Sequence, residues 1–430
     1  MNNSEVFVSL DIGTSSVKVI IGEMSNNSLN IIGVGTAKAE GIRKGSIVDI
    51  DETVHSIKQA VEQAERMIGM KINRVIVGIA GSNHVGLQPC HGVVAVSGEN
   101  REISDDDVAR VIDAAEVISI PPEREIINII RHQFVVDGQD EINDPRRMIG
   151  VRLEMEGTIV TGSKTLLHNT LRCVERAGLE IVYIVLQPLA AASAALSKDE
   201  QNLGTALIDI GGGSTTLAVF KQGQLKGTAV IPIGGEHITK DLSIGLRTAT
   251  EDAEKIKIKH GHAYYDHASE DEVFSVPIIG SDQHQQFNQL ELADIIEARM
   301  EEIFELVQQE MNTMGVSDLP GGFVLTGGVA NMPGVMELAQ VILQNRVRVA
   351  IPDYIGVREP QYTNAVGLIR YANKDARLLG INVSAAPIQI TDELTEKRPA
   401  RPSTQKQNNE KHPDEKISSK VKKFFGYFFE

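Results

Sequence analysis

Two stretches of the sequence follow one pattern: Asp11-Ile-Gly-Thr-Ser-Ser-Val-Lys18 and Asp209-Ile-Gly-Gly-Gly-Ser-Thr-Thr216. Each begins where a short apolar run ends, at residues 6–10 and 205–208, and a second apolar run follows it. Two strands joined by a bend of glycine and hydroxyl residues predict a β-hairpin. Because the same hairpin occurs twice in one chain, the sequence predicts two related halves.

The composition narrows the class of protein. A chain of 430 residues, of which 42% are hydrophobic and 23% charged, has room for two folded domains. The net charge of −16 argues against nucleic acid as a partner, because phosphate backbones repel an acidic surface. Cys90 and Cys173 form no CxxC pair, and no secretory signal or membrane-spanning segment is visible, which favours a reducing cytosol.

Apolar periodicity and turn residues divide the chain into elements. Residues 86–160 interrupt the first half with strands and with a helix that starts after Ser104, so we expect an inserted subdomain there. Residues 236–258 and 290–314 predict two helices, with a polar stretch between them. Residues 391–415 have almost no large apolar side chains and predict a disordered linker.

Asp11 and Asp209 stand at strand ends beside glycine-rich turns, a combination that suits Mg²⁺ and polyphosphate. Carboxylates hold magnesium, usually through its retained waters, and glycine lets backbone N–H groups approach phosphate oxygens. One such copy alone is more often a strand end and turn, but here there are two. Gly327 and Gly328 follow a third strand and would let a nucleotide lie against the backbone; a tight strand-to-helix turn explains them equally well.

These three elements, in this order, resemble the phosphate 1, phosphate 2 and adenosine motifs of the actin/Hsp70/sugar-kinase superfamily. The two connecting helices of that superfamily have counterparts in Leu186-Gln-Pro-Leu-Ala-Ala-Ala-Ser-Ala-Ala195 and Tyr362-Thr-Asn-Ala-Val-Gly-Leu-Ile-Arg-Tyr371. The resemblance implies an α/β, actin-like duplicated ATPase fold, with two halves around a nucleotide cleft that binds ATP and Mg²⁺.

The resemblance also implies roles for single residues. Asp11 and Asp209 correspond to the magnesium carboxylates. Gln187 falls where the superfamily positions the attacking water, and since an amide is a poor proton acceptor we expect slow hydrolysis at most. Glu254 and Lys257 stand where relatives contact ribose and adenine, although such a pair is more often a solvated helix pair. The other implied nucleotide-binding residues are Gly13, Thr14, Ser15, Ser16, Lys18, Gly211, Gly212, Gly213, Ser214, Thr215, Gly327 and Gly328.

Residues 416–430 predict an amphipathic helix. Apolar side chains recur at helical spacing with lysines outside the stripe, and a basic helix with an aromatic face is typical of a membrane anchor. A terminal helix packed on the folded body is the alternative. The residues expected at the membrane are Ile417, Lys420, Val421, Lys422, Lys423, Phe424, Phe425 and Phe428.

The chain as a whole resembles the FtsA family of bacterial cell-division proteins. The first motif, the insertion, the segment Ile231-Pro-Ile-Gly-Gly-Glu-His-Ile and the tail carry this resemblance. It implies a protein that tethers filaments of the tubulin-like FtsZ to the cytoplasmic face of the membrane at the division septum. It also implies self-polymerisation and contacts with other division proteins. Arg299 is expected to contact the C-terminal peptide of FtsZ, although it could equally pair with Glu302 or Glu305.

The expected division of the chain follows that family. Residues 1–85 and 160–197 form the first half (1A), 86–159 the inserted subdomain (1C), 198–227 and 311–380 the second-half core (2A), and 228–310 its subdomain (2B). Residues 381–415 are the linker and 416–430 the membrane helix.

Two alternatives stay open. A pilus-assembly protein similar to PilM would share much of the architecture but usually lacks the amphipathic tail. A peripheral membrane scaffold with an inactive nucleotide site would share the tail but not the nucleotide. A metal site at His260, His262 and His267 is disfavoured, because these residues lie in a polar stretch without cysteines.

Overall fold

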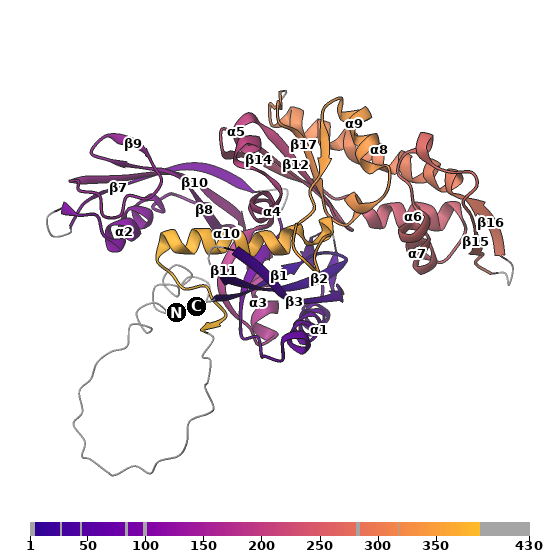
Figure 1. Cartoon of the computed structure of the whole chain (residues 1–430), viewed down its shortest axis with the longest axis horizontal. Coiled ribbons are helices and arrows are strands. Elements are labelled where there is room, and N and C mark those ends of the chain that lie inside the picture. Colours follow the sequence, from indigo (N-terminus) through magenta and orange to yellow (C-terminus); the bar gives the residue numbers. More distant parts are fainter. Residues whose placement is uncertain are drawn as a thin grey trace, which may run out of the picture.

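Two sheets with the same strand order form the centre of the molecule (Figure 1). The computed structural model describes residues 5–387 except 26–27, 44, 82–84, 98–100, 281–283 and 317. The first sheet has the order β11-β6-β1-β2-β3, and the second has β18-β17-β12-β13-β14. The first consists of β1 (Glu5–Ile12), β2 (Ser16–Ser25), β3 (Ser28–Lys38), β6 (Arg74–Ile79) and β11 (Glu180–Leu186), with β19 (Ala386–Pro387) paired to β1. The second consists of β12 (Thr205–Ile210), β13 (Thr215–Lys221), β14 (Gln224–Ile231), β17 (Gly322–Thr326) and β18 (Val347–Val349).

The pairing directions repeat as well. In both sheets the first hairpin is antiparallel and the next two strands run parallel to its first strand. Every residue of β1 after Glu5 is buried, as expected for a central strand that is covered on both faces. The prediction of two related halves, each opening with a β-hairpin, is therefore confirmed.

Helix α1 (Ile50–Ile68) covers the first sheet at β2 and β3. It begins after Asp49, whose side chain accepts a hydrogen bond from the Glu52 N–H, and it ends at Gly69 in the left-handed region. A Cβ on Gly35 would lie 1.9 Å from the Ala60 carbonyl oxygen, so this glycine sets how closely the helix approaches the strand. Helix α3 (Lys164–Arg176) packs beside α1, and the short strands β4 (Ile42–Arg43) and β5 (Ser46–Ile47) lie next to α3.

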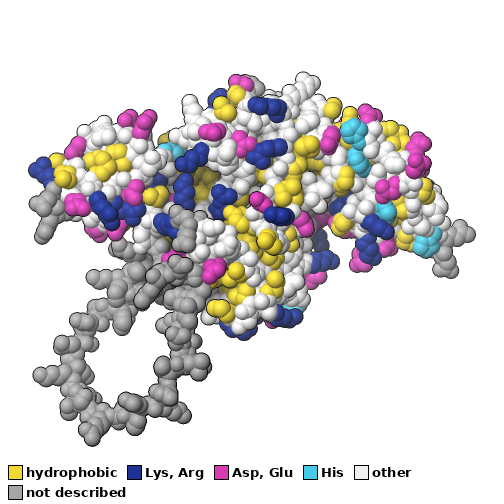
Figure 2. Space-filling view, viewed as in Figure 1, with side chains coloured by type: hydrophobic (Ala, Val, Ile, Leu, Met, Phe, Trp, Pro, Cys, Tyr) yellow, Lys and Arg dark blue, Asp and Glu magenta, His cyan; other side chains and the backbone are white. Residues whose placement is uncertain are grey.

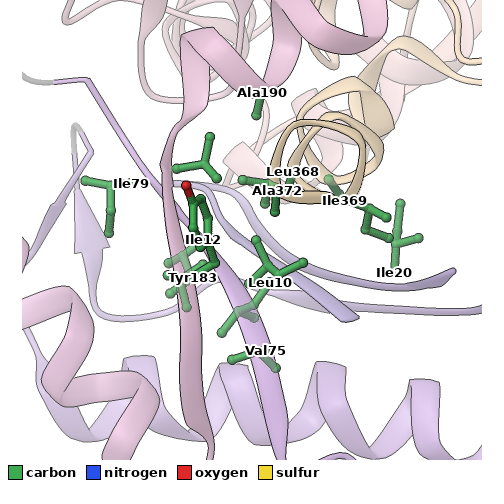
Figure 3. Packing of buried hydrophobic residues seen from close by; sticks show 14 of the residues in the cluster. Leu10, Ile12, Ile20, Val75, Ile79, Tyr183, Ala190, Leu368, Ile369 and Ala372 are labelled. Carbon is green, nitrogen blue, oxygen red and sulfur yellow. The ribbon is translucent and has the colours of Figure 1, made fainter. Parts of the chain in front are cut away.

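Helix α10 (Thr363–Leu379) packs on the first sheet although it follows the second one in sequence. Figure 3 shows Leu368, Ile369 and Ala372 of this helix directed toward Leu10 and Ile20 of the sheet. Residues 363–379 were counted with the second half in the sequence-based division, but their buried side chains join the first-half core. Helix α4 (Gln187–Ala195) packs against α10, and α5 (Lys198–Leu203) leads into the second sheet.

The inserted segment forms a four-stranded antiparallel sheet with its own core. It contains β7 (Gly86–Ala95), α2 (Asp105–Ala115), β8 (Arg124–Val136), β9 (Gln139–Ile142) and β10 (Arg152–Ser163). Arg131 of β8 pairs with Asp375 of α10, which also accepts a hydrogen bond from the Tyr183 hydroxyl. The Asn128 side chain joins β8 to β11 by bonding the Ile184 carbonyl and the Leu186 N–H, at 3.0 and 2.8 Å.

Helices α6 (Gly235–Gly245), α7 (Thr250–His260) and α8 (Gln289–Thr313) form the other end of the molecule (Figure 1). The prediction of one helix over 236–258 is wrong, because Arg247 takes a φ of 53° and the chain turns there. Two hydrogen bonds stabilise this turn. The Thr248 N–H donates to the Ser243 carbonyl, and the Ser243 hydroxyl donates to the Thr248 carbonyl. The polar stretch contains η2 (Tyr265–His267) and the hairpin β15 (Val273–Pro277) and β16 (His284–Asn288). Short helix η3 (Val329–Asn331), α9 (Val335–Leu343) and η4 (Pro360–Tyr362) complete this half.

The predicted linker and the predicted amphipathic helix lie outside the described residues. Within the described part of the chain, no helix is long and apolar enough to cross a bilayer. On the face shown in Figure 2, charged side chains of both signs are interspersed, and histidines gather at the end formed by α6–α8. These histidines form no metal cluster, because no group of three potential ligands occurs among the residues that the structure describes.

Candidate functional site

The two glycine turns have the same local structure. In the first, the Gly13 N–H donates to the Ser16 carbonyl at 3.1 Å; in the second, the Gly211 N–H donates to the Ser214 carbonyl at 3.0 Å. Each turn connects the first two strands of its sheet, β1 to β2 and β12 to β13. The sequence repeat is therefore also a structural repeat, and it places one Asp-bearing turn in each half.

A carboxylate stands before each turn, and each is held by an amide from a helix. Gln187, the first residue of α4, donates from Nε2 to Oδ1 of Asp11 at 2.6 Å. Asn364, the second residue of α10, donates from Nδ2 to Oδ2 of Asp209 at 2.7 Å. Both carboxylates thus keep a defined orientation before any ligand arrives.

Burial makes the charged form of these acids unfavourable. Burial raises the pKa of Asp209 to about 6; the Asn364 hydrogen bond opposes this rise, and the nearby charge of Asp11 adds to it. Burial also raises the pKa of Asp11, against the opposing effects of the Lys18 charge and the Gln187 hydrogen bond. Two desolvated carboxylates with one buried lysine leave a net negative site, which is the charge that a divalent cation would neutralise.

The two turns touch each other across the gap between the halves. The Ser15 hydroxyl donates to Oε1 of Glu236 at 2.8 Å, which joins the first turn to the start of α6. A Cβ on Gly212 would lie 1.7 Å from Ser15 Oγ, and one on Gly213 would lie 2.5 Å from Thr14 Cγ2. A Cβ at either glycine would meet a side chain of the opposite turn, which shows how closely the turns approach, and a larger group between the turns requires the two halves to separate.

Hydroxyl groups and Lys18 surround the turns. Lys18 is 8% exposed, and its Nζ donates to Ser16 Oγ at 2.8 Å. Thr14 Oγ1 accepts from the Gly45 N–H, and the Thr215 hydroxyl donates to the Ile233 carbonyl. In the second turn, the Ser214 carbonyl accepts a hydrogen bond from the Gly211 N–H. The predicted phosphate-binding residues are therefore gathered in one place.

The third glycine element joins the second half of the site. Gly327 has a φ of 91°, and a Cβ there would lie 2.3 Å from Oδ1 of Asp209. A side chain at this position would thus collide with the carboxylate. The next residue, Gly328, has open space where a Cβ would stand, with nothing within 4 Å. This open position is compatible with a flat ligand against the backbone.

Glu254 and Lys257 form a closed arrangement on α7. Nζ of Lys257 donates to the Gly235 carbonyl, to Thr239 Oγ1 and to Glu254 Oε2, at 3.0, 2.8 and 2.7 Å. An ammonium group has three donors, so all of them are used. Lys257 could contact a ligand only through its alkyl chain, whereas the side chain of Glu254 is 43% exposed.

Arg299 lies on α8, away from the glycine turns. Its Nε and Nη2 bond the two carboxylate oxygens of Asp241 at 2.6 and 3.1 Å, and its Nη1 bonds Glu302. The pairing with Glu302 matches one of the alternatives left open by the sequence. No local spacing predicts the contact with Asp241, which approaches from α6.

The sequence-based set omitted two residues that the structure places in the site. Asn364 contacts Asp209 across 155 positions, and Glu236 contacts Ser15 across 221 positions. Asn364 lies in the second connecting helix, and Glu236 lies in the Ile231-Pro-Ile-Gly-Gly-Glu segment. Their polar side chains within otherwise apolar or glycine-rich motifs were the available signal.

The residues present fit a magnesium-bound polyphosphate. Paired desolvated carboxylates suit a hydrated cation, and glycine turns whose backbone N–H groups a ligand can approach suit phosphate oxygens. The Asn364 Oδ1 atom is buried without a hydrogen-bond partner, which leaves an acceptor available for a ligand or its water.

Three family models match this chain. "Cell division protein FtsA" matches residues 206–367, "SHS2 domain inserted in FTSA" matches 82–161, and "Cell division protein FtsA, C-terminal" matches 374–430. The cell division protein FtsA of Bacillus subtilis is 63% identical over 380 residues, which are 88% of this chain and 86% of that protein. The FtsA of Enterococcus hirae is 42% identical over the full length of both chains.

Solved structures show the same fold at low sequence identity. The PilM–PilN type IV pilus biogenesis complex matches with a TM-score of 0.56 and 15% identity, over 84% of this chain and 97% of that chain. MreB5 of Spiroplasma citri bound to ADP matches with a TM-score of 0.52 and 15% identity, over 87% and 97%. These matches confirm the actin-like fold.

Proposed function

Because this chain belongs to the FtsA family of cell-division proteins, we propose that it binds Mg·ATP between its halves and tethers FtsZ filaments to the membrane. One observation carries the nucleotide part of this proposal. Two hairpin turns with the same internal hydrogen bond, one beside the buried Asp11 and one beside the half-buried Asp209, lie directly against each other at the junction of the two sheets. An MreB structure with a similar fold was solved with ADP, which supports a nucleotide in the corresponding cleft.

The turn residues indicate where each part of the nucleotide would lie. Phosphate oxygens would lie between the turns at residues 13–16 and 211–215, with Lys18 opposite the added charge. Magnesium would be held by Asp11 and Asp209 through its waters and would neutralise the phosphates. The base would lie at Gly327 and Gly328 and beside Glu254. Phosphates in this position require the bond between Ser15 and Glu236 to break.

Hydrolysis at this site is expected to be slow. The Gln187 amide is engaged by Asp11 through Nε2, so only Oε1 remains to accept a hydrogen bond from a water molecule. An amide oxygen orients water but does not take its proton at neutral pH. Nucleotide occupancy is therefore the state that we expect to control the protein.

The FtsZ contact is proposed for residues 228–310, with Arg299 as a contact to the acidic C-terminal peptide of FtsZ. In the free protein Arg299 already holds Asp241 and Glu302, so a peptide carboxylate has to replace one of them. Replacement is feasible because the Arg299 side chain remains 25% exposed. A guanidinium group offers five donors, which allows it to exchange acidic partners.

Membrane attachment is proposed for residues 416–430. The apolar stripe and lysines of that segment fit the cytoplasmic face of the membrane at the division septum, with the linker giving reach between lipid and body. Self-polymerisation and contacts with other division proteins are proposed from the family alone. The pilus-assembly alternative loses support, because the FtsA relative is 63% identical while the PilM match is 15% identical.

Co-sedimentation with anionic liposomes tests this function. Purified FtsZ should sediment only when the intact chain is present, and more FtsZ should sediment with Mg·ATP than without nucleotide. A chain that carries FtsZ to liposomes equally well with and without any bound nucleotide would support a scaffold with an inactive nucleotide site instead. FtsZ that stays in the supernatant in all cases would contradict the tether.

A further inference from the structure

Asn364 contacts Asp209, but none of the roles proposed above involves Asn364. It is the second residue of α10 and holds the Asp209 carboxylate at 2.7 Å. Its amide orientation follows from this contact, since an ionised carboxylate only accepts hydrogen bonds and the amide must present its N–H group. The Oδ1 atom of Asn364 consequently points away from Asp209, and it is buried without a hydrogen-bond partner.

The duplication of the fold makes Asn364 the counterpart of Gln187. The two sheets correspond strand by strand, so that β11 corresponds to β18 and β1 to β12. Helix α4 follows β11 and begins with Gln187, which donates to the carboxylate of β1. Helix α10 is the next long helix after β18 and begins with Thr363 and Asn364, which donates to the carboxylate of β12. Each half thus contributes one carboxylate and one amide.

The two helices are locked together near these amides. A Cβ on Gly367 would lie 1.9 Å from the Ala190 carbonyl oxygen, so α10 contacts the backbone of α4 one turn after Asn364. Thr363, next to Asn364, is 1% exposed. The amide is therefore held in place by packing and not by its own hydrogen bond alone.

A small cavity connects the two amides. Its volume is about 10 Å³, and it is lined by four polar residues (Gln187, Asp209, Thr216 and Asn364) and four apolar ones (Pro188, Ala191, Leu207 and Ala218). A cavity of this size accommodates about one water molecule, and a buried water needs polar partners of this kind. Oδ1 of Asn364 is an acceptor without a partner beside this cavity, and a water held on a cation is a strong donor.

We propose that Asn364 is a positioning residue of the magnesium site: its Nδ2 orients Asp209, and its Oδ1 accepts a hydrogen bond from a magnesium-bound water in the shared cavity. This inference rests on the proposed Mg·ATP binding and deepens it. It gives the second half of the chain an amide that acts on the metal, opposite Gln187 of the first half. The free protein keeps the acceptor available because nothing else bonds it.

The test compares ATP affinity in Mg²⁺ with ATP affinity in EDTA, measured by calorimetry on the full-length chain. The ratio of the two affinities reports the contribution of the metal. Loss of an outer partner of a metal site typically lowers metal affinity by about 10–100-fold. Asn364→Ala should therefore lower the ratio by about tenfold or more, while the affinity in EDTA stays within about twofold of wild type.

Two further variants complete the experiment. Asn373→Ala removes the same side chain further along α10, where it does not line the cavity, and should change neither affinity. Asn364→Ser places a smaller polar residue at the helix start. It should lower the ratio of the two affinities less than Asn364→Ala does. If the alanine variant does not fold, the serine variant takes its place in the test.

The outcomes separate this inference from the proposed function. Suppose that Mg²⁺ raises the ATP affinity of the wild-type chain and that the position-364 variants keep the same ratio of affinities in Mg²⁺ and in EDTA. This result would leave the proposed function standing and overturn the role of Asn364. An equal fall of both affinities would show a purely structural residue and would overturn it as well. A wild-type chain without Mg·ATP binding would overturn both the inference and the function on which it rests.

Discussion

Asp11 and Asp209 are desolvated acids whose positions cost the free protein stability. The pKa of Asp209 rises from 3.8 to about 6, so the folded chain holds this proton more tightly than the unfolded chain does. Between these two values stability falls as pH rises, and at neutral pH the full cost of about 3 kcal/mol is present. Such a cost is typical of a site that is completed by its ligand.

Asp209→Asn should stabilise the nucleotide-free protein. The amide keeps the shape of the carboxyl and can still accept a hydrogen bond from Asn364, but it removes the buried charge. We expect a gain of about 1–3 kcal/mol, seen as a melting temperature a few degrees higher in buffer with EDTA. With Mg·ATP the order should reverse, because the ligand stabilises only the chain that binds it. A variant that melts below wild type in EDTA would contradict this account of the carboxylate.

Asp107, in helix α2, shows the opposite behaviour. It lies in the first turn of α2 and is fully buried. Burial alone would raise its pKa, but hydrogen bonds from the backbone and side chains of Ser104 and Ser97 outweigh burial and hold the pKa of Asp107 well below its usual range. The side chain also accepts from Arg110. The start of α2 therefore depends on the charged form of one residue.

Asp107→Ala should destabilise the inserted subdomain by about 3 kcal/mol at neutral pH, because it leaves donors of both serines without a partner. The folded pKa is lowered, so the stabilisation is present above the unfolded pKa of about 3.9 and is lost as pH falls below it. Hydrogen exchange of α2 amides should be faster in the variant at pH 7, with a smaller difference only below about pH 3. Asp106→Ala, at an exposed neighbour in the same turn, should leave exchange unchanged. Equal protection of α2 in wild type and in Asp107→Ala would refute this role.

Arg299 connects α8 with α6 and is proposed to meet the FtsZ peptide. Arg299→Glu should weaken peptide binding by about 1.5–3 kcal/mol, since a charge-assisted contact is replaced by repulsion, while Mg·ATP affinity stays unchanged. Arg348→Glu is the matched control, because Arg348 holds Glu200 at 2.8 and 2.9 Å in the same two-pronged manner but belongs to β18. If both variants bind the peptide with the affinity of wild type, Arg299 is not a contact.

Elements with a local pattern could be predicted from the sequence. The hairpins β1–β2 and β12–β13 follow from apolar runs around a glycine turn, and α2 follows from the Ser104 cap. The break between α6 and α7 could not, because it depends on a left-handed residue that is Arg247 and not glycine. The contacts of Asn364 and Glu236 arise only when distant elements meet, so no local spacing predicts them.

The proposed membrane helix is expected to act mainly through its apolar face. Five large apolar side chains could contribute about 7–15 kcal/mol on burial in the interface, whereas each lysine contributes about 1 kcal/mol near anionic lipid. Phe425→Glu should therefore release the protein from liposomes more completely than Lys422→Gln, and added salt should weaken binding without abolishing it.

Truncation after Pro413 controls for the folded body. The truncated chain should bind Mg·ATP as the intact chain does and should remain in the supernatant when liposomes are sedimented. If it sediments as fully as the intact chain, the anchor lies elsewhere in the molecule.

The most direct test of the account is a calorimetric titration of Mg·ATP into the wild-type chain, Asp11→Ala and Asp209→Ala. The duplicated site requires one carboxylate from each half. We therefore expect binding by the wild-type chain and a loss of at least about tenfold in affinity, or about 1.4 kcal/mol, for each variant. Wild-type affinity in either correctly folded variant would contradict a cleft built from two equivalent halves.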